Sequence, residues 1–226
     1  MNLKFMSIKI SYKNSFTKKN SSNLIFFVDE KFNLSSLKKN ISNDEYLYIS
    51  DLLKTSDSKK EILFFKINSK KIIYLISLKK DLKIHELENL GAKFSELIND
   101  EKQNDYLINL DLAKNKIENF VGYFLHGLKL KSYKFNKYKS KKNKKDISIN
   151  VISNKNKISL QNQLRFKAIE EGTFFSRDLV SEPGNVLHPD EYAKRINSLK
   201  KFGLKINIYD QKKLKKLGMN ALLGVG

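Results

Sequence analysis

The chain has 226 residues, of which 40% are hydrophobic, and its formal net charge at pH 7 is +20. This hydrophobic content can fill a globular core, which excludes wholesale disorder, and no apolar run approaches the roughly 20 residues that span a bilayer. The absence of cysteine excludes disulfides, thiolate metal sites and a cysteine nucleophile, and the alternating start is not a signal peptide, so we expect a cytoplasmic protein.

The positive charge is made almost entirely of lysine. Only three of the 44 basic residues are arginine, namely Arg165, Arg177 and Arg195. Guanidinium groups carry most base-edge and bidentate phosphate recognition, so their scarcity argues against a dedicated nucleic-acid reader. Lysine, asparagine and isoleucine are all abundant, which an AT-rich coding bias would produce whatever the function. The charge alone therefore does not establish a nucleic-acid partner.

The first two thirds of the chain alternate between strand-like and helix-like patterns. In chain order they predict strands over 3–11 and 24–28, a weak helix over 34–53 broken at 42–44, a hairpin of 61–67 with 71–77, a helix over 82–98, a strand over 106–112, a helix over 117–130 and a strand over 147–152. Interleaved strands and helices predict the α/β class, with a mixed sheet covered by helices on both faces. The polar bridge 153–157 predicts a domain boundary.

The remainder predicts a second, smaller set of elements. A long helix carries apolar residues at near-four-residue steps; these are Leu160, Leu164, Ala168, Phe175 and Leu179. A turn containing both prolines of the chain, Pro183 and Pro189, ends this helix and begins another over 190–201. A strand with alternating apolar residues, a short basic helix and a glycine-rich start of a further strand are expected to follow.

A lysine-rich segment, residues 129–145, is a candidate nucleic-acid contact. It holds nine lysines with Tyr133, Phe135 and Tyr138 among them, and cations beside aromatic faces suit single-stranded nucleic acid. The candidate contacts are Lys134, Lys137, Lys139, Lys141, Lys142, Lys144 and Lys145. The alternative is a solvated connection after a helix, with the aromatic side chains packing back on the domain.

No residue of this chain is predicted to be catalytic or to bind a metal. The run from His85 to Asn89 lacks the second histidine of a zinc-protease signature, so His85 is interpreted as a helix-face residue. His126 has no obvious carboxylate partner nearby in the sequence. His188 precedes Pro189 in a turn, and the acidic residues after it favour the start of the next helix.

Three stretches together resemble the leucyl aminopeptidases, also called cytosol aminopeptidases. They are Ser132–Lys139, the Arg-Asp-Leu-Val-Ser-Glu-Pro-Gly-Asn-Val-Leu-His-Pro run at 177–189, and Lys216–Gly226 with its Ala-Leu-Leu-Gly-Val-Gly ending. The chain departs from the family at Lys134 and Asn136, where arginine and aspartate are common, and at Ser181 and His188, where asparagine and threonine are usual. The His188 departure removes a good helix cap.

The resemblance implies that residues 1–153 form an N-terminal α/β domain similar to a macro domain. Residues 154–226 would then be a linker helix and a truncated start of the catalytic domain. Members of the family are hexameric exopeptidases in which two divalent metal ions, manganese or zinc, activate a hydroxide for the release of N-terminal residues from peptides. The family's metal-binding and catalytic motifs lie downstream of the part that this sequence contains, so none of their residues is assigned here.

We therefore expect a metalloaminopeptidase by family resemblance that is inactive as this chain alone. Peptide substrates and a hexamer would belong to a full-length form. The alternative is a non-enzymatic nucleic-acid-binding or assembly module that uses the lysine-rich segment. Truncation would leave apolar groups of the C-terminal part partly uncovered and that part less stable than the N-terminal domain. The groups concerned are Leu204, Ile206, Ile208, Leu222, Leu223 and Val225.

Overall fold

The computed structural model describes most of the chain as two compact units. The described residues are 8–13, 23–35, 37–57, 59–99, 101–110, 117–140, 146–153 and 158–225. The first unit spans Met1–Thr173 and the second spans Phe174–Gly226. Each unit has its own architecture.

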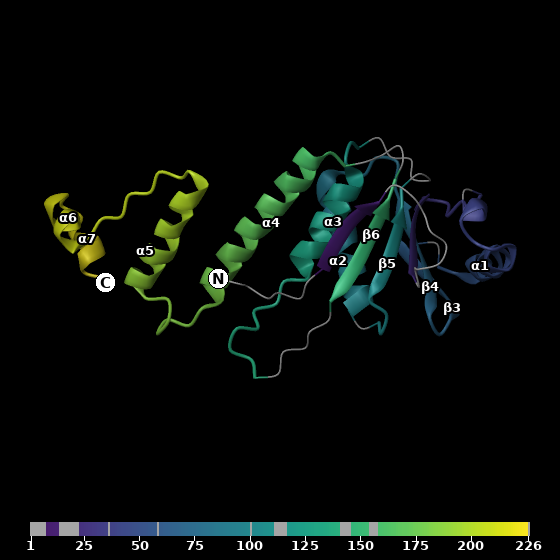
Figure 1. Ribbon diagram of the computed structural model, residues 1–226, viewed down its shortest axis with the longest axis horizontal. Coiled ribbons are helices and arrows are strands. Elements are labelled where there is room, and N and C mark those ends of the chain that lie inside the picture. The colour runs from purple at the N-terminus through teal and green to yellow at the C-terminus, as the bar shows by residue number, and fades with distance from the viewer. Residues whose placement is uncertain are drawn as a thin grey trace. The chain divides into compact units, whose positions relative to one another are not determined.

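The first unit is built on a sheet of six described strands (Figure 1). The strands are β1 (Ile8–Lys13), β2 (Asn23–Asp29), β3 (Ile62–Asn68), β4 (Lys71–Leu78), β5 (Asp105–Asn109) and β6 (Ile147–Ile152). Their order is β1-β6-β5-β2-β4-β3, and all neighbours are parallel except the antiparallel pair β3 and β4. The predicted hairpin is therefore confirmed, and it places β3 at one edge of the sheet.

Helices cover both faces of this sheet. Helices α2 (Ile84–Asn99) and α3 (Phe120–Lys131) lie on one face, and α1 (Asn43–Thr55) with the short 3₁₀ helix η1 (Leu37–Lys39) lies on the other (Figure 1). Strand β2 shows why both faces need cover: Ile25 and Phe27 point into the core under α2 and α3, whereas Leu24 and Phe26 point into the opposite core. The predicted α/β class, with a mixed sheet flanked by helices, is confirmed.

The start of α1 lies at the stretch that was predicted to interrupt a helix. Ser42 is the N-cap: its side chain accepts a hydrogen bond from the Glu45 N–H at 3.2 Å, and the Glu45 carboxylate accepts one from the Ser42 N–H at 3.1 Å. This capping box satisfies two donors that have no partner within the helix. The polar residues at 42–44 therefore begin a helix instead of breaking one.

A long helix, α4 (Leu160–Ser181), begins in the first unit and ends in the second. In the first unit it packs on α3 through Phe166, whose ring lies 5.1 Å from that of Tyr123. The predicted apolar stripe is not the packed face, because Leu160 and Leu164 are 69% and 57% exposed. The boundary between residues 153 and 154 that the sequence suggested stays a prediction.

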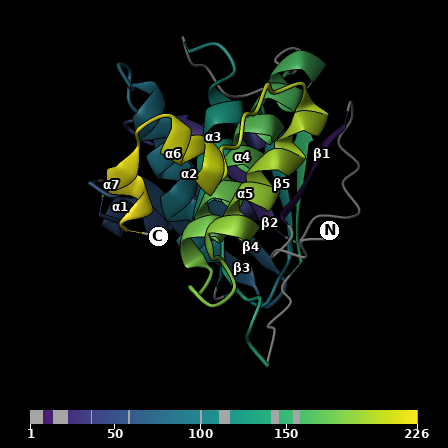
Figure 2. The ribbon, with the colours of Figure 1, turned by 90° about the vertical axis from the view of Figure 1, so that its left-hand side faces the viewer.

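The second unit contains further short helices and, among its described residues, no strand (Figure 2). They are α5 (Pro189–Asn197), the 3₁₀ helix η2 (Ser198–Phe202), α6 (Gln211–Lys216) and α7 (Asn220–Leu223). The strand predicted around Leu204, Ile206 and Ile208 is wrong for this structure, because a strand forms only against a partner strand and the described part of the unit supplies none. The glycine-rich end likewise forms α7, not a strand.

Side chains of the second unit are poorly covered. None of the residues in α5, η2, α6 or α7 is buried. Leu204 is 53% exposed, Ile208 48%, Leu222 56% and Val225 90%, and Ile206 and Leu223 are partly exposed. The predicted uncovering of these apolar groups is therefore confirmed.

Candidate functional site

The described residues hold no ready-made metal centre. No group of three or more histidine, cysteine, aspartate or glutamate side chains within them could bind a metal ion. His85 is exposed on α2, and His188 is the exposed N-cap of α5, where it makes no side-chain capping bond. Neither histidine belongs to a metal-binding group among the described residues.

His126 is the only one of the three histidines with a buried side chain. Its side chain is 7% exposed on α3, and its Nδ1 shares a hydrogen bond of 2.8 Å with Glu88 Oε1 on α2. The imidazole also packs against the Phe166 ring at 5.6 Å, while its Nε2 is buried without a hydrogen-bond partner. This carboxylate partner could not be predicted from the sequence, because 38 residues separate Glu88 from His126 and only the pairing of α2 with α3 brings them together.

The first lysines of the lysine-rich segment already contact other residues of the first unit. Lys129 forms an ion pair with Glu170 at 2.9 Å, and Lys131 forms one with Glu96. Lys134 donates a hydrogen bond to the Asn99 side chain at 3.2 Å. These contacts tie the end of α3 to α2 and α4 within the first unit, so this part of the segment has a structural role.

The next residues of the segment are more open. Tyr133 and Phe135 are half-buried, as the packing alternative predicts, whereas Tyr138 is 54% exposed. The Tyr138 ring contacts that of Phe135, and the Lys137 ammonium lies 5.4 Å from its centroid. Lys139 is exposed. The candidates Lys141, Lys142, Lys144 and Lys145 lie outside the described residues. Nucleic-acid contact by this segment stays a prediction.

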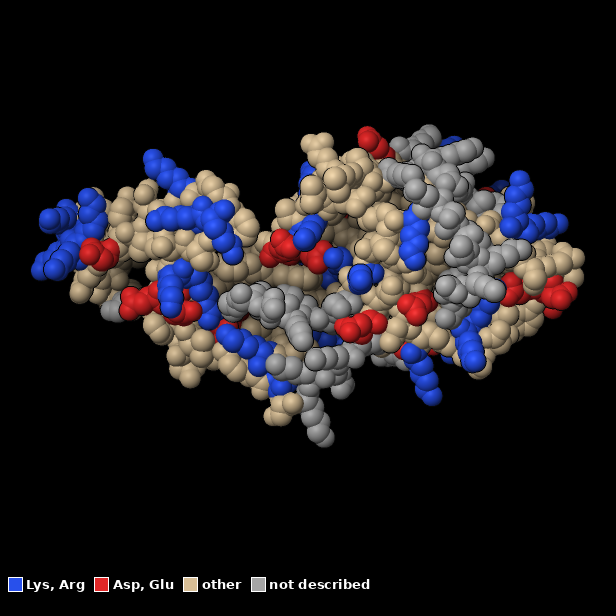
Figure 3. All heavy atoms as spheres, viewed as in Figure 1, with Lys and Arg blue, Asp and Glu red and all other residues tan. Residues whose placement is uncertain are grey.

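Charge on the visible face of the molecule is dispersed. Figure 3 shows lysine and arginine side chains spread over this face with aspartate and glutamate side chains among them. An electrostatic track for a nucleic acid would instead gather cations along one groove or stripe. On this face the charge follows the general abundance of lysine.

An arginine fork in the second unit links α5 to the residue that directly follows α4, across the proline turn. Arg195 on α5 donates from Nη1 to Glu182 Oε1 at 3.0 Å and from Nε to Glu191 Oε1 at 2.9 Å. The Glu182 side chain is 2% exposed and that of Arg195 is 15% exposed, so the pair is largely withdrawn from water. The hydrogen bond from Arg195 lowers the pKa of Glu191, which keeps that carboxylate charged.

This fork was not predicted from the sequence. The four-residue spacing of Glu191 and Arg195 on one helix could have indicated half of it. The contact to Glu182 depends on how the chain turns at Pro183 and could not. The fork fixes the angle between the end of α4 and α5, and it explains physically why the run 177–189, which carries much of the family resemblance, contains a glutamate at 182.

Comparison with known proteins shows which family this chain is similar to. Residues 174–226 match the model of the cytosol aminopeptidase family, catalytic domain. A probable cytosol aminopeptidase of Phytoplasma mali (strain AT) is 39% identical over 120 residues, which are 52% of this chain and 24% of that relative. This chain is related to the cytosol aminopeptidases. The match spans about a quarter of the length of this curated relative.

Solved structures of a leucine aminopeptidase and of a bottromycin maturation enzyme are similar in fold to this chain. A mutant of tomato leucine aminopeptidase matches with a TM-score of 0.75 and 16% identity, over 96% of this chain and 47% of that one. The bottromycin maturation enzyme BotP in complex with Mn matches with a TM-score of 0.61 and 14% identity, over 88% of this chain and 40% of that one. The resemblance seen in the sequence is thus confirmed for part of the family's length. Within the described residues, no helix combines the length and apolarity that crossing a bilayer requires.

Proposed function

We propose that this chain is the front part of a leucyl aminopeptidase that removes N-terminal residues from peptides. In this proposal residues 1–153 form the N-terminal domain, and residues 154–226 form the linker helix and the first elements of the catalytic domain. The observation that carries the proposal is the catalytic-domain match over residues 174–226. That range begins where the second compact unit begins, which supports its being a structural module.

The proposed chemistry requires groups that the described residues do not supply. A two-metal exopeptidase uses its ions to polarise the scissile carbonyl and to generate hydroxide at neutral pH. The described side chains form no cluster fit for such ions. The Mn named for BotP supports manganese as the metal of a longer form. A hexamer and a cytoplasmic location are further parts of the proposal, which rest on the family alone.

The test compares the 226-residue chain with a longer polypeptide. We expect the purified chain to release no leucine from leucyl p-nitroanilide with Mn²⁺ or Zn²⁺ present. A polypeptide that continues the reading frame through lysine- and aspartate-containing metal motifs should turn over the substrate, and a chelator should stop it. Metal-dependent turnover by the 226-residue chain alone, after removal of contaminating peptidases, would contradict the proposal.

A second candidate function is binding of single-stranded nucleic acid by the lysine-rich segment. It is favoured by the exposed Tyr138 ring, which lies between the exposed Lys137 and Lys139. Such binding should weaken steeply with salt because counterions are released from the phosphates. Lys137→Gln with Lys139→Gln should weaken it further, whereas the charge-matched control Lys31→Gln with Lys39→Gln should not. Affinity for an oligonucleotide that is equal at low and high salt would eliminate this function.

A further inference from the structure

Strand β3 forms one edge of the sheet, and its outer side has no strand partner among the described residues. The Ser77 N–H donates to the Glu61 carbonyl at 2.8 Å, so these two residues form a hydrogen-bonded pair that continues the β3–β4 ladder. Hydrogen-bonded pairs alternate with non-hydrogen-bonded pairs along an antiparallel ladder. The N–H and C=O groups of Ile62, Phe64 and Lys66 therefore point outward, away from β4.

These outward groups are open to a further strand. No described residue forms a hydrogen bond with the outward backbone groups of Ile62, Phe64 or Lys66. Unpaired N–H and C=O groups along a sheet edge are a ready template for another extended chain. The register with β4 shifts between Lys66 and Asn68, so the regular part of this edge ends at Lys66. We call the outward side of residues 62–66 the free edge of β3.

The side chains of β3 are covered on one face of the sheet and not on the other. Leu63 and Phe65 are buried in the core that lies under α1. On the opposite face Ile62 is half-buried and Phe64 is 46% exposed, although both are apolar. The Phe64 ring lies 6.1 Å from the ring of Tyr74 on β4, so it lies against the sheet. The free edge therefore borders an uncovered apolar strip.

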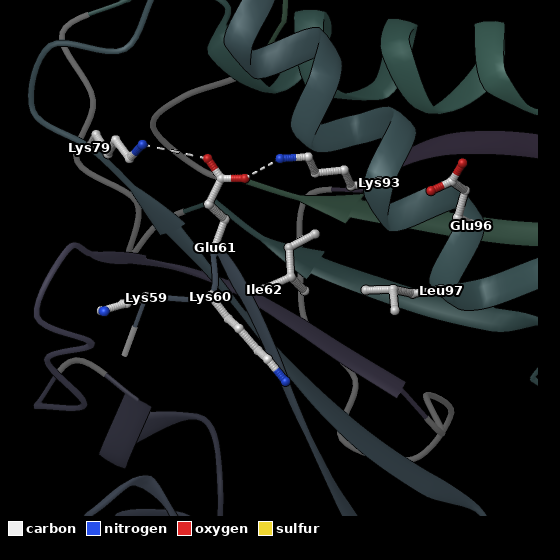
Figure 4. Close-up of a pocket in the computed structure, with 8 residues that line it drawn as sticks. All are labelled: Lys59, Lys60, Glu61, Ile62, Lys79, Lys93, Glu96 and Leu97. Atoms are coloured by element: carbon white, nitrogen blue, oxygen red, sulfur yellow. Dashed lines mark hydrogen bonds and ion pairs between the residues drawn. The ribbon is translucent and has the colours of Figure 1, made fainter. Parts of the chain in front are cut away.

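A hollow at the start of β3 continues this strip. Ile62 and Leu97 of α2 both line it, and Leu97 is 37% exposed (Figure 4). The other residues of its lining are polar: Lys59, Lys60, Glu61, Lys79, Lys93 and Glu96. Glu61 forms ion pairs with Lys79 and Lys93, so its negative charge is compensated within the fold (Figure 4). An apolar side chain that an added strand places opposite Ile62 would therefore lie beside further apolar surface.

Lysines lie at both ends of the free edge. Lys60 precedes β3, Lys66 lies within it and Lys70 lies in the turn that follows, and all three are exposed. Lys60 and Lys70 form no ion pair with a described acid, whereas Lys66 contacts Glu101 at 3.5 Å. These cations attract a partner with acidic side chains. They oppose pairing with a second copy of this chain, whose formal net charge at pH 7 is also +20.

We propose that the free edge of β3 binds an extended acidic segment of another protein as an added antiparallel strand. The main chain of the segment bonds to the outward N–H and C=O groups of Ile62, Phe64 and Lys66, and antiparallel pairing is the more stable of the two directions. An apolar side chain of the segment packs on the Phe64 ring, and acidic side chains near its two ends face the lysines. Because alternate side chains of a strand share a face, the segment alternates apolar with polar residues.

A nucleic acid fits this edge less well than a peptide does. It would meet the same lysines, but it has no main-chain N–H and C=O groups that could continue the ladder. The inference concerns the first unit, and it does not rest on the proposed peptidase function. Its tests measure binding alone, so they can fail without bearing on that function.

The first experiment measures, by fluorescence anisotropy in about 150 mM salt, binding of the labelled peptide Asp-Glu-Val-Thr-Val-Thr-Val-Glu-Asp to the intact chain. Two further peptides carry methyl groups on alternate backbone nitrogens, along one edge of the strand or the other, and keep every charge and side chain. The peptide methylated on the edge that faces β3 should bind at least about tenfold more weakly, and the other within about threefold. Absence of binding, equal affinity of all three peptides, or equal loss for both methylated ones would overturn the proposal.

The second experiment removes one outward donor from the chain itself. Phe64→Pro loses the outward N–H and leaves the β3–β4 ladder intact, because proline is tolerated in an edge strand where its nitrogen faces away from the partner. Phe64→Ala loses the ring and keeps the donor. Phe64→Pro should bind the unmodified peptide about three- to tenfold more weakly than Phe64→Ala, since one further hydrogen bond is lost. Similar melting temperatures verify that both variants fold, and equal affinity of the two folded variants contradicts the proposal.

The third experiment tests the charge and the competing occupant. Lys60→Gln with Lys70→Gln should weaken peptide binding by at least about threefold. Lys9→Gln with Lys13→Gln removes the same charge from β1, at the opposite edge of the sheet, and should leave the affinity within about twofold. Equal weakening by both double variants would mean that the peptide senses only net charge, which refutes the proposal. A dimer of the peptide-free chain in sedimentation, dissociated by Phe64→Pro, would assign the edge to a second copy instead.

Discussion

Arg195 has a role that depends on its chemistry as well as its charge. The planar guanidinium presents several donors in fixed directions, so one side chain can reach Glu182 and Glu191 together. Because Glu182 is 2% exposed, its carboxylate has given up most of its contact with water and depends on protein donors. The fork therefore stabilises the α4–α5 turn through groups that cannot return to solvent without unfolding.

Replacing this arginine should destabilise the second unit. Arg195→Ala leaves Glu182 buried without its guanidinium, at a cost of about 3 kcal/mol in the free energy of unfolding. Arg195→Lys should recover only part of this loss, since an ammonium cannot reproduce the fork. Urea denaturation followed by a probe in α5 measures the change. Arg165→Ala, at an exposed position of α4, is the control, and an effect of equal size there would refute the assigned role.

Glu45 makes the stability of the first unit depend on pH. Burial raises its pKa, but hydrogen bonds from Lys71 and from the Ser42 N–H outweigh that effect and the net pKa is lowered. A carboxyl group of this kind adds stability above its unfolded pKa of about 4.3, and this stability is lost as the pH falls through the folded pKa.

Glu45→Gln should therefore destabilise the protein at pH 7 and not at low pH. Loss of the charged partner of Lys71 should cost about 1–2 kcal/mol at pH 7. The difference from the parent protein should shrink as the pH falls below the unfolded pKa of about 4.3 and vanish once the pH is below the lowered folded pKa, where the parent's Glu45 is protonated as well. Urea titrations at several pH values measure it. A difference that stays constant from pH 7 to pH 3 would show that the charge of Glu45 contributes nothing.

Two glycines allow the backbones of α2 and α3 to approach each other closely. A Cβ atom on Gly127 would lie 1.9 Å from the Glu88 carbonyl oxygen, and one on Gly91 would lie 1.9 Å from that of Phe124. The two backbones thus touch, which also brings His126 within hydrogen-bonding distance of Glu88. Glycine is normally a poor helix residue, so this close approach explains its presence here.

Alanine should have opposite effects at two helical glycines. Gly127→Ala forces α2 and α3 apart and should destabilise the first unit by about 3 kcal/mol. Gly172→Ala, in α4, meets no atom within 4 Å and should stabilise by about 0.5–1 kcal/mol through helix propensity alone. Thermal unfolding of the two variants side by side tests this difference. Similar melting temperatures for both would show that α2 and α3 are not in close contact.

The whole molecule combines a well-covered unit with an exposed one. The first unit buries both faces of its sheet, whereas the helices after α4 bury no side chain and leave Phe202, Leu217 and Val225 among the exposed apolar residues. Burial of apolar surface is the main source of folding free energy, so the two units should differ in stability. Uncovered apolar groups of this extent are also an aggregation hazard.

Hydrogen exchange should resolve the two units. Amides of α5, α6 and α7 should exchange at least about 100-fold faster than those of β2 and β4, because these three helices contain no buried residue and their opening exposes little apolar surface. Mass spectrometry of the exchanging chain, with peptides assigned to each element, measures the difference. Equal protection of the amides in both units would contradict this difference in stability.

Much of the first unit could be read from local pattern. The alternation and flanking turns located β3 and β4, and the three- and four-residue apolar steps located α2 and α3, because burial of one face imposes those periods. The pattern failed on α4, where Leu160 and Leu164 are exposed and Phe166 makes the contact. A helix of mixed polarity carries apolar side chains on several faces, and only the surface of α3 decides which of these faces is packed.

The amino-acid sequence by itself determined the α/β class, the positions of most helices and strands, and the relationship to the cytosol aminopeptidases, since these depend on residue types at short spacing. Only the tertiary structure decided the strand order, the partner of His126, the fork on Arg195 and the lysine-lined hollow around Glu61. The strand order, the His126 pair and the hollow join residues far apart in the chain, and the fork depends on the turn at Pro183 that brings Glu182 to Arg195. It also decided that the apolar alternation after residue 203 forms no strand here, because a strand is stabilised by its neighbour and not by its own sequence.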